Sequence, residues 1–223
     1  MALLKITSPH AHGPAKTSWV MQQVILATIP GIIALTWFFG FGTLVNIVWA
    51  SIVALLTEAL FLKIRGRPLG FYLKDCSALV TAVLLAIALP PYAPWWLVML
   101  GAIFAIVFGK QLYGGMGYNP FNPAMVAYVV LLVSLPVQMT QWAAPRMAGT
   151  SVLGPVDAFL NNFGFSNAID GHTMATPLDV LKQNNSLMLD QLWAANAQFG
   201  QFGGTGWEWA NLGFLVGGLY LLS

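Results

Sequence analysis

Long apolar stretches separated by short polar segments dominate the chain. Six stretches carry almost no charge: Trp19–Phe39, Thr43–Leu62, Ser77–Leu89, Trp95–Leu112, Ala124–Met139 and Trp207–Ser223. A helix needs about 20 apolar residues to cross a bilayer, and the first two runs reach that length. The pattern predicts an all-α, polytopic helical membrane protein with about six transmembrane helices in this chain. For the short third and fifth runs, the alternatives are a tilted helix, a locally thinned bilayer or a partly re-entrant path.

The composition of the 223 residues supports a membrane protein. Hydrophobic residues make up 58% of the chain and charged residues 7%, whereas a soluble domain carries about 25% charged residues. So few charges cannot cover a soluble globule, and so high a hydrophobicity excludes a disordered chain. The first apolar run is too long for the core of a signal peptide and lacks a cleavage site, so we interpret it as an uncleaved span.

Basic residues are distributed unequally between the two sides that six spans would create. Seven of the nine fall on the side of the N-terminus: Lys5, Lys16, Lys63, Arg65, Arg67, Lys74 and Lys110. Only Arg146 and Lys182 fall on the other side. Lys and Arg accumulate in cytoplasmic loops, so we expect a cytoplasmic N-terminus and an external, periplasmic loop. The predicted division is a tail with five membrane helices (1–139), the external loop (140–206) and the start of a sixth helix (207–223).

Several classes of site are excluded or weakly supported. The net charge of +2 is small and scattered, which argues against nucleic-acid binding. The single cysteine, Cys76, excludes an internal disulfide and a cysteine-ligated cluster within this chain. We predict no metal site and no catalytic residue, and the chain lacks the GxGxxG and Walker patterns typical of nucleotide binding.

The external loop contains a segment with recognisable local chemistry, from Asp170 to Asp179. Asp-Gly is a turn pair, and Thr176 stands directly before Pro177 with Asp179 three residues further on. A Thr at the N-cap followed by Pro at the first helical position is typical of a helix start. Taken alone, the pattern indicates a capped surface helix.

The same segment resembles a flavin attachment motif. Asp-Gly-x-Thr-x-Ala-Thr-Pro-Leu-Asp at 170–179 is similar to the flavinylation motif of the RnfD family, which provides a membrane component of Rnf electron-transport complexes. The NqrB component of the sodium-pumping NADH:quinone reductase is related to this family. The resemblance extends over nearly the whole chain. It includes 37–45 in the first hairpin, 75–81 and 90–96 around the third and fourth spans, and 110–124, which is its most distinctive stretch.

This resemblance implies a cofactor, partners and a location. It implies FMN bound covalently through a phosphoester to Thr176, attached by a flavin transferase, in a bacterial inner-membrane complex whose other components are designated A, B, C, E and G. Met174 departs from the small or polar residue more usual at its position. Family members continue with further membrane helices, so the chain resembles their N-terminal two-thirds. We expect the ester phosphate near a helix N-terminus, where free N–H groups favour anions.

Two other functions remain as alternatives: a cofactor-free transporter or permease, and a structural anchor for other subunits. Glu58 is an acid in the interior of an apolar run, a position that marks functional candidates. We interpret it instead as a snorkelling acid at the interface, paired with Lys63. The glycine-rich segment 114–123 fits either a cytoplasmic loop with turn chemistry or irregular backbone packed near a cofactor or an ion path.

Overall fold

The computed structural model describes residues 16–146, 151–166 and 171–222, and there the regular structure is helical except for two isolated β-bridges. The helices are α1 (Thr17–Phe39), α2 (Gly42–Ile64), α3 (Leu69–Leu73), α4 (Ser77–Ala88), α5 (Trp95–Phe104), the π-helix η1 (Ala105–Gln111), α6 (Pro123–Ser134), α7 (Pro136–Thr140), α8 (Pro155–Asn162), α9 (Pro177–Gln183), α10 (Leu189–Ala195) and α11 (Trp207–Leu222). The all-α prediction is confirmed for these residues. Within them, α1 and α2 are long and apolar enough to span a bilayer, and α4, α5–η1 and α6 are shorter apolar helices.

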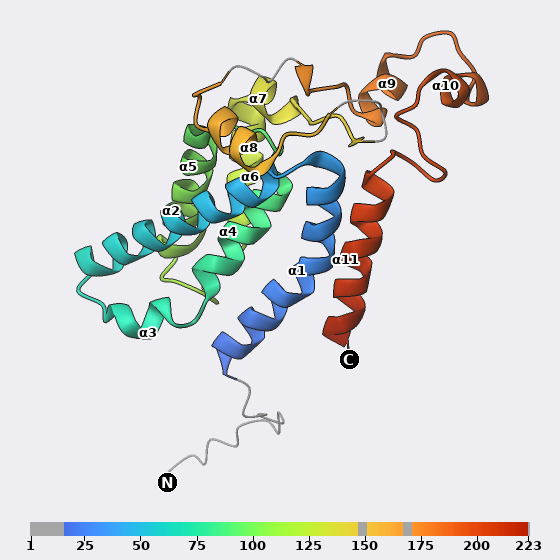
Figure 1. Cartoon of the computed structure of the whole chain (residues 1–223). Helices are drawn as coiled ribbons and strands as arrows, with labels where there is room; N and C mark the ends of the chain where they lie inside the picture. The colour runs from blue at the N-terminus through green and yellow to red at the C-terminus, as the bar shows by residue number, and fades with distance from the viewer. Residues whose placement is uncertain (1–15, 147–150, 167–170, 223) are drawn as a thin grey trace.

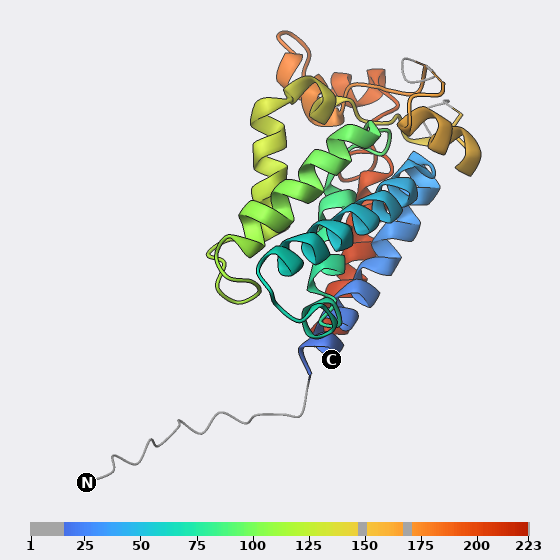
Figure 2. The same ribbon diagram turned by 90° about the vertical axis from the view of Figure 1, so that its left-hand side faces the viewer.

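The connections lie at two opposite ends of the helices (Figure 1). The first residues of α1, the last residues of α11 and the α2–α4 connection lie at one end. Residues 141–146, 151–166 and 171–206 lie at the other end, with the turns 40–41 and 89–94. The quarter-turned view separates the same two ends (Figure 2). This arrangement is the one that alternating spans require, and it gathers the basic residues 16, 63, 65, 67, 74 and 110 toward one end.

Helices α1 and α11 pack side by side although they are the first and last helices of the chain (Figure 1). Small residues make this approach possible. A Cβ added at Gly217 would lie 1.8 Å from the carbonyl oxygen of Ala27, and one at Gly213 would lie 2.8 Å from that of Pro30. Gly213 and Gly217 are four residues apart, a spacing that lets membrane helices approach closely. Pro30 lies within α1 without ending it.

Two predicted runs differ from the helices observed. The fifth run, Ala124–Met139, is two helices, because Pro136 lacks the N–H that would continue α6 and begins α7 instead. Leu135 between them has φ −134° and ψ 55°, outside the α region that the residue before a proline disfavours. The fourth run is continuous, but seven of its residues, Ala105–Gln111, form the π-helix η1.

Buried polar contacts attach α8 to the membrane helices. The Asn46 side chain on α2 donates to the Pro90 carbonyl at 2.9 Å. Asn162 at the end of α8 donates to the Asn46 side-chain oxygen at 3.0 Å. The Tyr92 hydroxyl donates to the Phe39 carbonyl at 3.1 Å and accepts from the Leu153 N–H at 3.3 Å.

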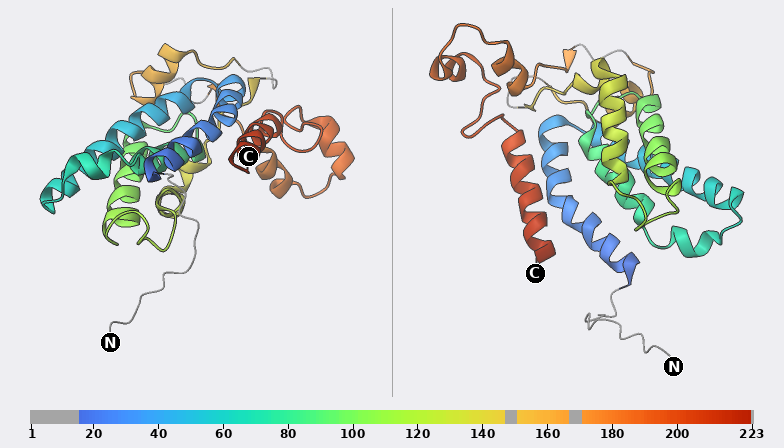
Figure 3. Two further views of the ribbon diagram at one scale, coloured as in Figure 1. Left: turned by 90° about the horizontal axis from the view of Figure 1, so that it is seen from below. Right: turned by 180° about the vertical axis from the view of Figure 1, so that it is seen from behind.

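The α9–α10 lobe (residues 171–206) extends past α11, away from α2 (Figure 3).

Candidate functional site

A charged cluster lies buried between α2, α4 and η1. Glu58 is 1% exposed and Lys110 is 3% exposed, and the Lys110 ammonium is 2.5 Å from Glu58 Oε1. Lys110 also donates to Ser77 Oγ at 2.6 Å, and Gln111 Nε2 donates to Glu58 Oε1 at 2.8 Å. The interpretation of Glu58 as a snorkelling acid is therefore wrong: its carboxylate is internal, and its partner is Lys110.

The π-helix supplies two adjacent side chains to this cluster. A turn of π-helix holds more residues than a turn of α-helix, so successive side chains point in directions that differ from those on an α-helix. Such turns are frequent at functional sites. Lys110 and Gln111 consequently both reach Glu58. Gly109 permits the close packing of η1 on α6, since a Cβ there would lie 2.8 Å from the Pro123 Cα.

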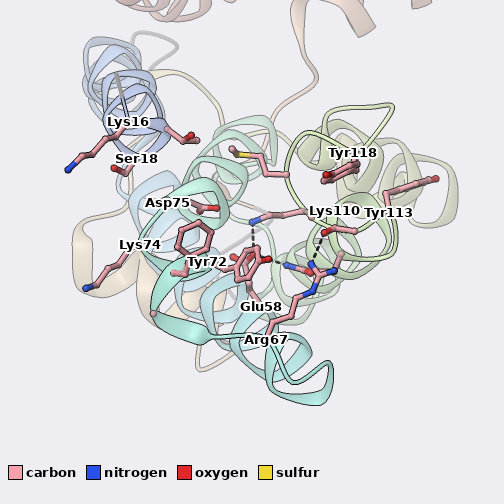
Figure 4. Close-up of a pocket in the computed structure, with 17 residues that line it drawn as sticks. Lys16, Ser18, Glu58, Arg67, Tyr72, Lys74, Asp75, Lys110, Tyr113 and Tyr118 are labelled. Carbon is pink, nitrogen blue, oxygen red and sulfur yellow. Dashed lines mark hydrogen bonds and ion pairs between the residues drawn. The ribbon is translucent and has the colours of Figure 1, made fainter. Parts of the chain in front are cut away.

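The cluster borders a pocket of about 1000 Å³ at the basic end of the molecule (Figure 4). The start of α1, the α2–α4 connection and the 113–118 turn contribute its walls, including Lys16, Lys74, Arg67, Tyr113 and Tyr118. Arg67 crosses from one loop to the other and donates to the Gly114 carbonyl at 2.8 Å. Among the described residues, Glu58 Oε2 and Gln111 Oε1 are buried without a hydrogen-bond partner.

The structure shows the turn geometry of the glycine-rich segment 114–123. Gly114, Gly115 and Gly117 have φ of 113°, 115° and 88°, which side-chain-bearing residues rarely adopt. Turn chemistry therefore explains the glycines. The same turn also lines the pocket that Lys110 borders, and the interpretation of a nearby cofactor or ion path stays a prediction.

Thr176 lies in the lobe at the opposite end of the molecule and caps α9 as predicted. Its Oγ1 donates to Asp179 Oδ2 at 2.6 Å and accepts from the Asp179 N–H at 3.3 Å, while its own N–H donates to the same carboxylate at 3.2 Å. The residue is half-buried. With only seven residues in α9 and a carboxylate already at its first turn, the helix N-terminus is a weaker anion site than the sequence suggested.

The segment before Thr176 is fixed by a short antiparallel pairing. The Ala144 N–H donates to the His172 carbonyl at 2.9 Å, and the Met174 N–H donates to the Trp142 carbonyl at 3.1 Å. Thr173 forms a bridge with Ala143.

Asp170, the first residue of the motif, lies outside the described residues. The pairing stops before Ala175, so Thr176 is held next to an anchored strand-like segment.

A narrow slot opens beside Thr176. Its walls include Trp142, Met174, Pro177, Gln198 and Trp207. The two indole rings are 4.7 Å apart and pack edge to face. Gln198 Oε1 is buried and has no hydrogen-bond partner among the described residues. The free volume is about 10 Å³, which is room for one water-sized group and no more.

The sequence predicted the helix cap at Thr176 but indicated neither the slot beside it nor the buried pairing of Glu58 with Lys110. Lys63 is five residues from Glu58, a spacing that does not place two side chains on one helix face. A usable signal was present, because Lys110 is a lysine inside a predicted span and a buried acid needs a partner. Gln198 and Trp142 are 22 and 34 residues away from Thr176 along the chain. No local pattern in the sequence indicates that either residue lies beside Thr176.

The chain matches the model of the NQR2, RnfD, RnfE family over residues 5–223. It is 61% identical over 222 residues to the D component of the ion-translocating oxidoreductase complex of Ectopseudomonas mendocina, covering 100% of this chain and 63% of that protein. The corresponding proteins of Cellvibrio japonicus and Shigella dysenteriae are 55% and 48% identical, with 63% and 65% of their lengths covered. The chain thus spans somewhat less than two-thirds of these relatives, and it belongs to the NQR2, RnfD, RnfE family.

Proposed function

We propose that the chain is part of a membrane subunit of an ion-translocating oxidoreductase complex, and that it carries FMN as a phosphoester on Thr176. The observation that supports this most directly is the position of Thr176: a half-buried hydroxyl within the motif, beside a slot, in a segment fixed by backbone pairing. The relatives' names, as components of such complexes, agree with the function. Bound FMN would supply reversible electron transfer.

The residues around Thr176 fit a flavin phosphate ester in two respects. The Thr176 hydroxyl is held at the start of a helix by Asp179. The slot beside it is lined by Gln198, whose Oε1 is buried and has no hydrogen-bond partner in the part of the chain that the structure describes. One contact has to change on attachment. The esterified oxygen has no hydrogen to donate to Asp179, and the phosphate adds a negative charge next to that carboxylate. Asp179 would therefore turn away from Thr176, while the Asp179 N–H remains available to the ester.

We place the two ends of the molecule on opposite sides of the membrane. The basic end, with the N-terminus of α1, faces the cytoplasm, and residues 140–206 face the periplasm of a bacterial inner membrane. Electrons would pass between Thr176-bound FMN and the other components of the complex (A, B, C, E and G), coupled to ion movement. A flavin transferase would attach the FMN.

The test is the covalent flavin itself. The whole subunit is produced with a flavin transferase, and its intact mass and in-gel fluorescence after denaturation are measured. Thr176→Ala should assemble in the membrane and lose all covalent flavin, while Thr173→Ala, the matched control three residues away, should keep it. Thr176→Ser retains a hydroxyl and should label at least partly.

The rival functions predict different results. A cofactor-free permease would show no flavin mass on the wild-type chain. A purely structural anchor would show no loss of electron flow in Thr176→Ala. Retained labelling in Thr176→Ala with loss in Thr173→Ala would place the ester on the other threonine and contradict the assignment.

A further inference from the structure

The lobe that carries Thr176 holds a second polar group whose partner is absent from the described residues. Gln198 Oε1 is buried and unpaired, and leaving such an acceptor unsatisfied is unfavourable. Buried side-chain acceptors normally have a protein or water partner. Gln198 and Thr176 both line the same slot, so a group attached to Thr176 would lie close to the Gln198 side chain.

The backbone around Gln198 is held in place rather than loose. The Thr205 N–H donates to the Gln198 carbonyl at 2.8 Å, and the Gly200 N–H donates to the Gly203 carbonyl at 2.7 Å. Glu208 Oε1 accepts from the Phe202 and Gly203 N–H groups at 2.6 and 2.7 Å. These bonds form a tight hairpin from Gln198 to Thr205.

This hairpin is packed directly against the residue that follows Thr176. A Cβ added at Gly204 would lie 2.7 Å from Pro177 Cγ and 2.8 Å from Trp207 Cδ1. Only glycine permits this approach, so the hairpin and the start of α9 form one surface. The slot between them is therefore a fixed feature of the lobe.

The size of the slot selects which part of FMN can enter. A free volume of about 10 Å³ admits one hydroxyl or one water, so the three-ring isoalloxazine stays outside. Gln198 Oε1 is an acceptor and needs a donor. A phosphodiester has no hydrogen to donate, whereas the ribityl chain next to the phosphate carries hydroxyl groups that do.

We infer that Gln198 accepts a hydrogen bond from a ribityl hydroxyl of the FMN on Thr176 and so positions the flavin. The inference rests on the proposed function, because it requires flavin at Thr176. In this inference the slot receives a hydroxyl of the ribityl chain. Gln198 positions the cofactor without contacting the redox-active ring. A second point of attachment beyond the ester restricts rotation of the flavin about its flexible side chain.

The experiment measures rotation of the tethered flavin by time-resolved fluorescence anisotropy in the assembled complex. Covalent loading is verified first by mass. Gln198→Leu removes the acceptor at similar volume, and Gln201→Leu changes an exposed glutamine in the same hairpin. We expect the population of freely rotating flavin to rise about five-fold in Gln198→Leu, as for the loss of one neutral hydrogen bond, and to stay unchanged in Gln201→Leu.

A second measurement needs no substitution. The transferase loads the wild-type subunit from a diphosphate-linked flavin whose side chain lacks hydroxyl groups, and the outer phosphate group leaves as the ester to Thr176 forms. This analogue should rotate as freely on the wild type as FMN does on Gln198→Leu. Equal immobilisation of the analogue and FMN, or an unchanged anisotropy in Gln198→Leu, would overturn the inference and leave a water in the slot. Absence of flavin from wild-type Thr176 would overturn the proposed function as well.

Discussion

The buried Glu58–Lys110 cluster and the Thr176 segment lie at opposite ends of the molecule and are built in opposite ways. The hydrogen bonds of the cluster join side chains from α2, α4 and η1 that are 33 to 53 positions apart along the chain. The Thr176 cap joins residues three positions apart. One depends on the packing of helices, the other on local backbone geometry. Substitutions should therefore affect helix assembly at the first and leave the fold nearly intact at the second.

The largest predicted effect is that the two ends of the molecule lie on opposite sides of the membrane. In the whole subunit, a topology reporter inserted after residue 70 should be cytoplasmic, and one inserted near residue 190 should be periplasmic. The physical reason is the concentration of basic residues at one end. Activity of a periplasm-specific reporter at residue 70 would contradict the prediction, because it would place the basic end of the molecule in the periplasm. A discrepancy at residue 190 alone would place the error in the short third or fifth run.

The next effect is the loss of one member of the buried ion pair. Lys110→Met leaves the Glu58 carboxylate internal with Gln111 as its remaining donor, and an unpaired buried charge costs about 3–5 kcal/mol. Thermal unfolding of the purified subunit in detergent should show a strong destabilisation.

The matched control neutralises both partners. Glu58→Gln combined with Lys110→Met removes the charges at similar volume and should be much less destabilised than Lys110→Met alone. Equal destabilisation of the single and double variants would show that packing, rather than charge pairing, holds η1 against α2.

A smaller effect is expected at the glycine that brings η1 close to α6. Gly109→Ala places a methyl group 2.8 Å from the Pro123 Cα, and overpacking of this kind costs about 1–3 kcal/mol. Gly70→Ala is the control, because a Cβ there has no heavy atom of another segment within 4 Å. If both variants unfold at the same temperature, the close approach is not required for the cluster.

The smallest effect is at the Thr176 cap. In the flavin-free subunit, Asp179→Asn keeps a side-chain oxygen but loses the carboxylate that accepts the hydrogen of the Thr176 hydroxyl. A helix cap contributes only about 1 kcal/mol. Hydrogen exchange of the α9 amides should increase slightly while the unfolding temperature of the subunit hardly changes. A large drop in that temperature would show that the lobe supports the membrane helices.

Individual elements show which kinds of inference the sequence permits. The apolar runs predicted the positions of α1, α2 and α11 closely, and the Thr-Pro-x-Asp pattern predicted the α9 cap, because each depends on neighbouring residues. Pro136 divided the fifth run through a local rule that could have been applied. The π-turn in η1 had no sequence signal, and with it the pairing of Lys110 with Glu58 was missed.

The sequence by itself determined the helical class, the segregation of basic residues and the place of Thr176 at a helix start, since hydropathy, charge and capping act over a few residues. Only the tertiary structure decided that α1 packs against α11 through glycines, that Glu58 is buried against Lys110, and that Gln198 shares a slot with Thr176. These contacts join distant segments, and the free energy that selects them comes from packing and from satisfying buried polar groups, which no local pattern encodes.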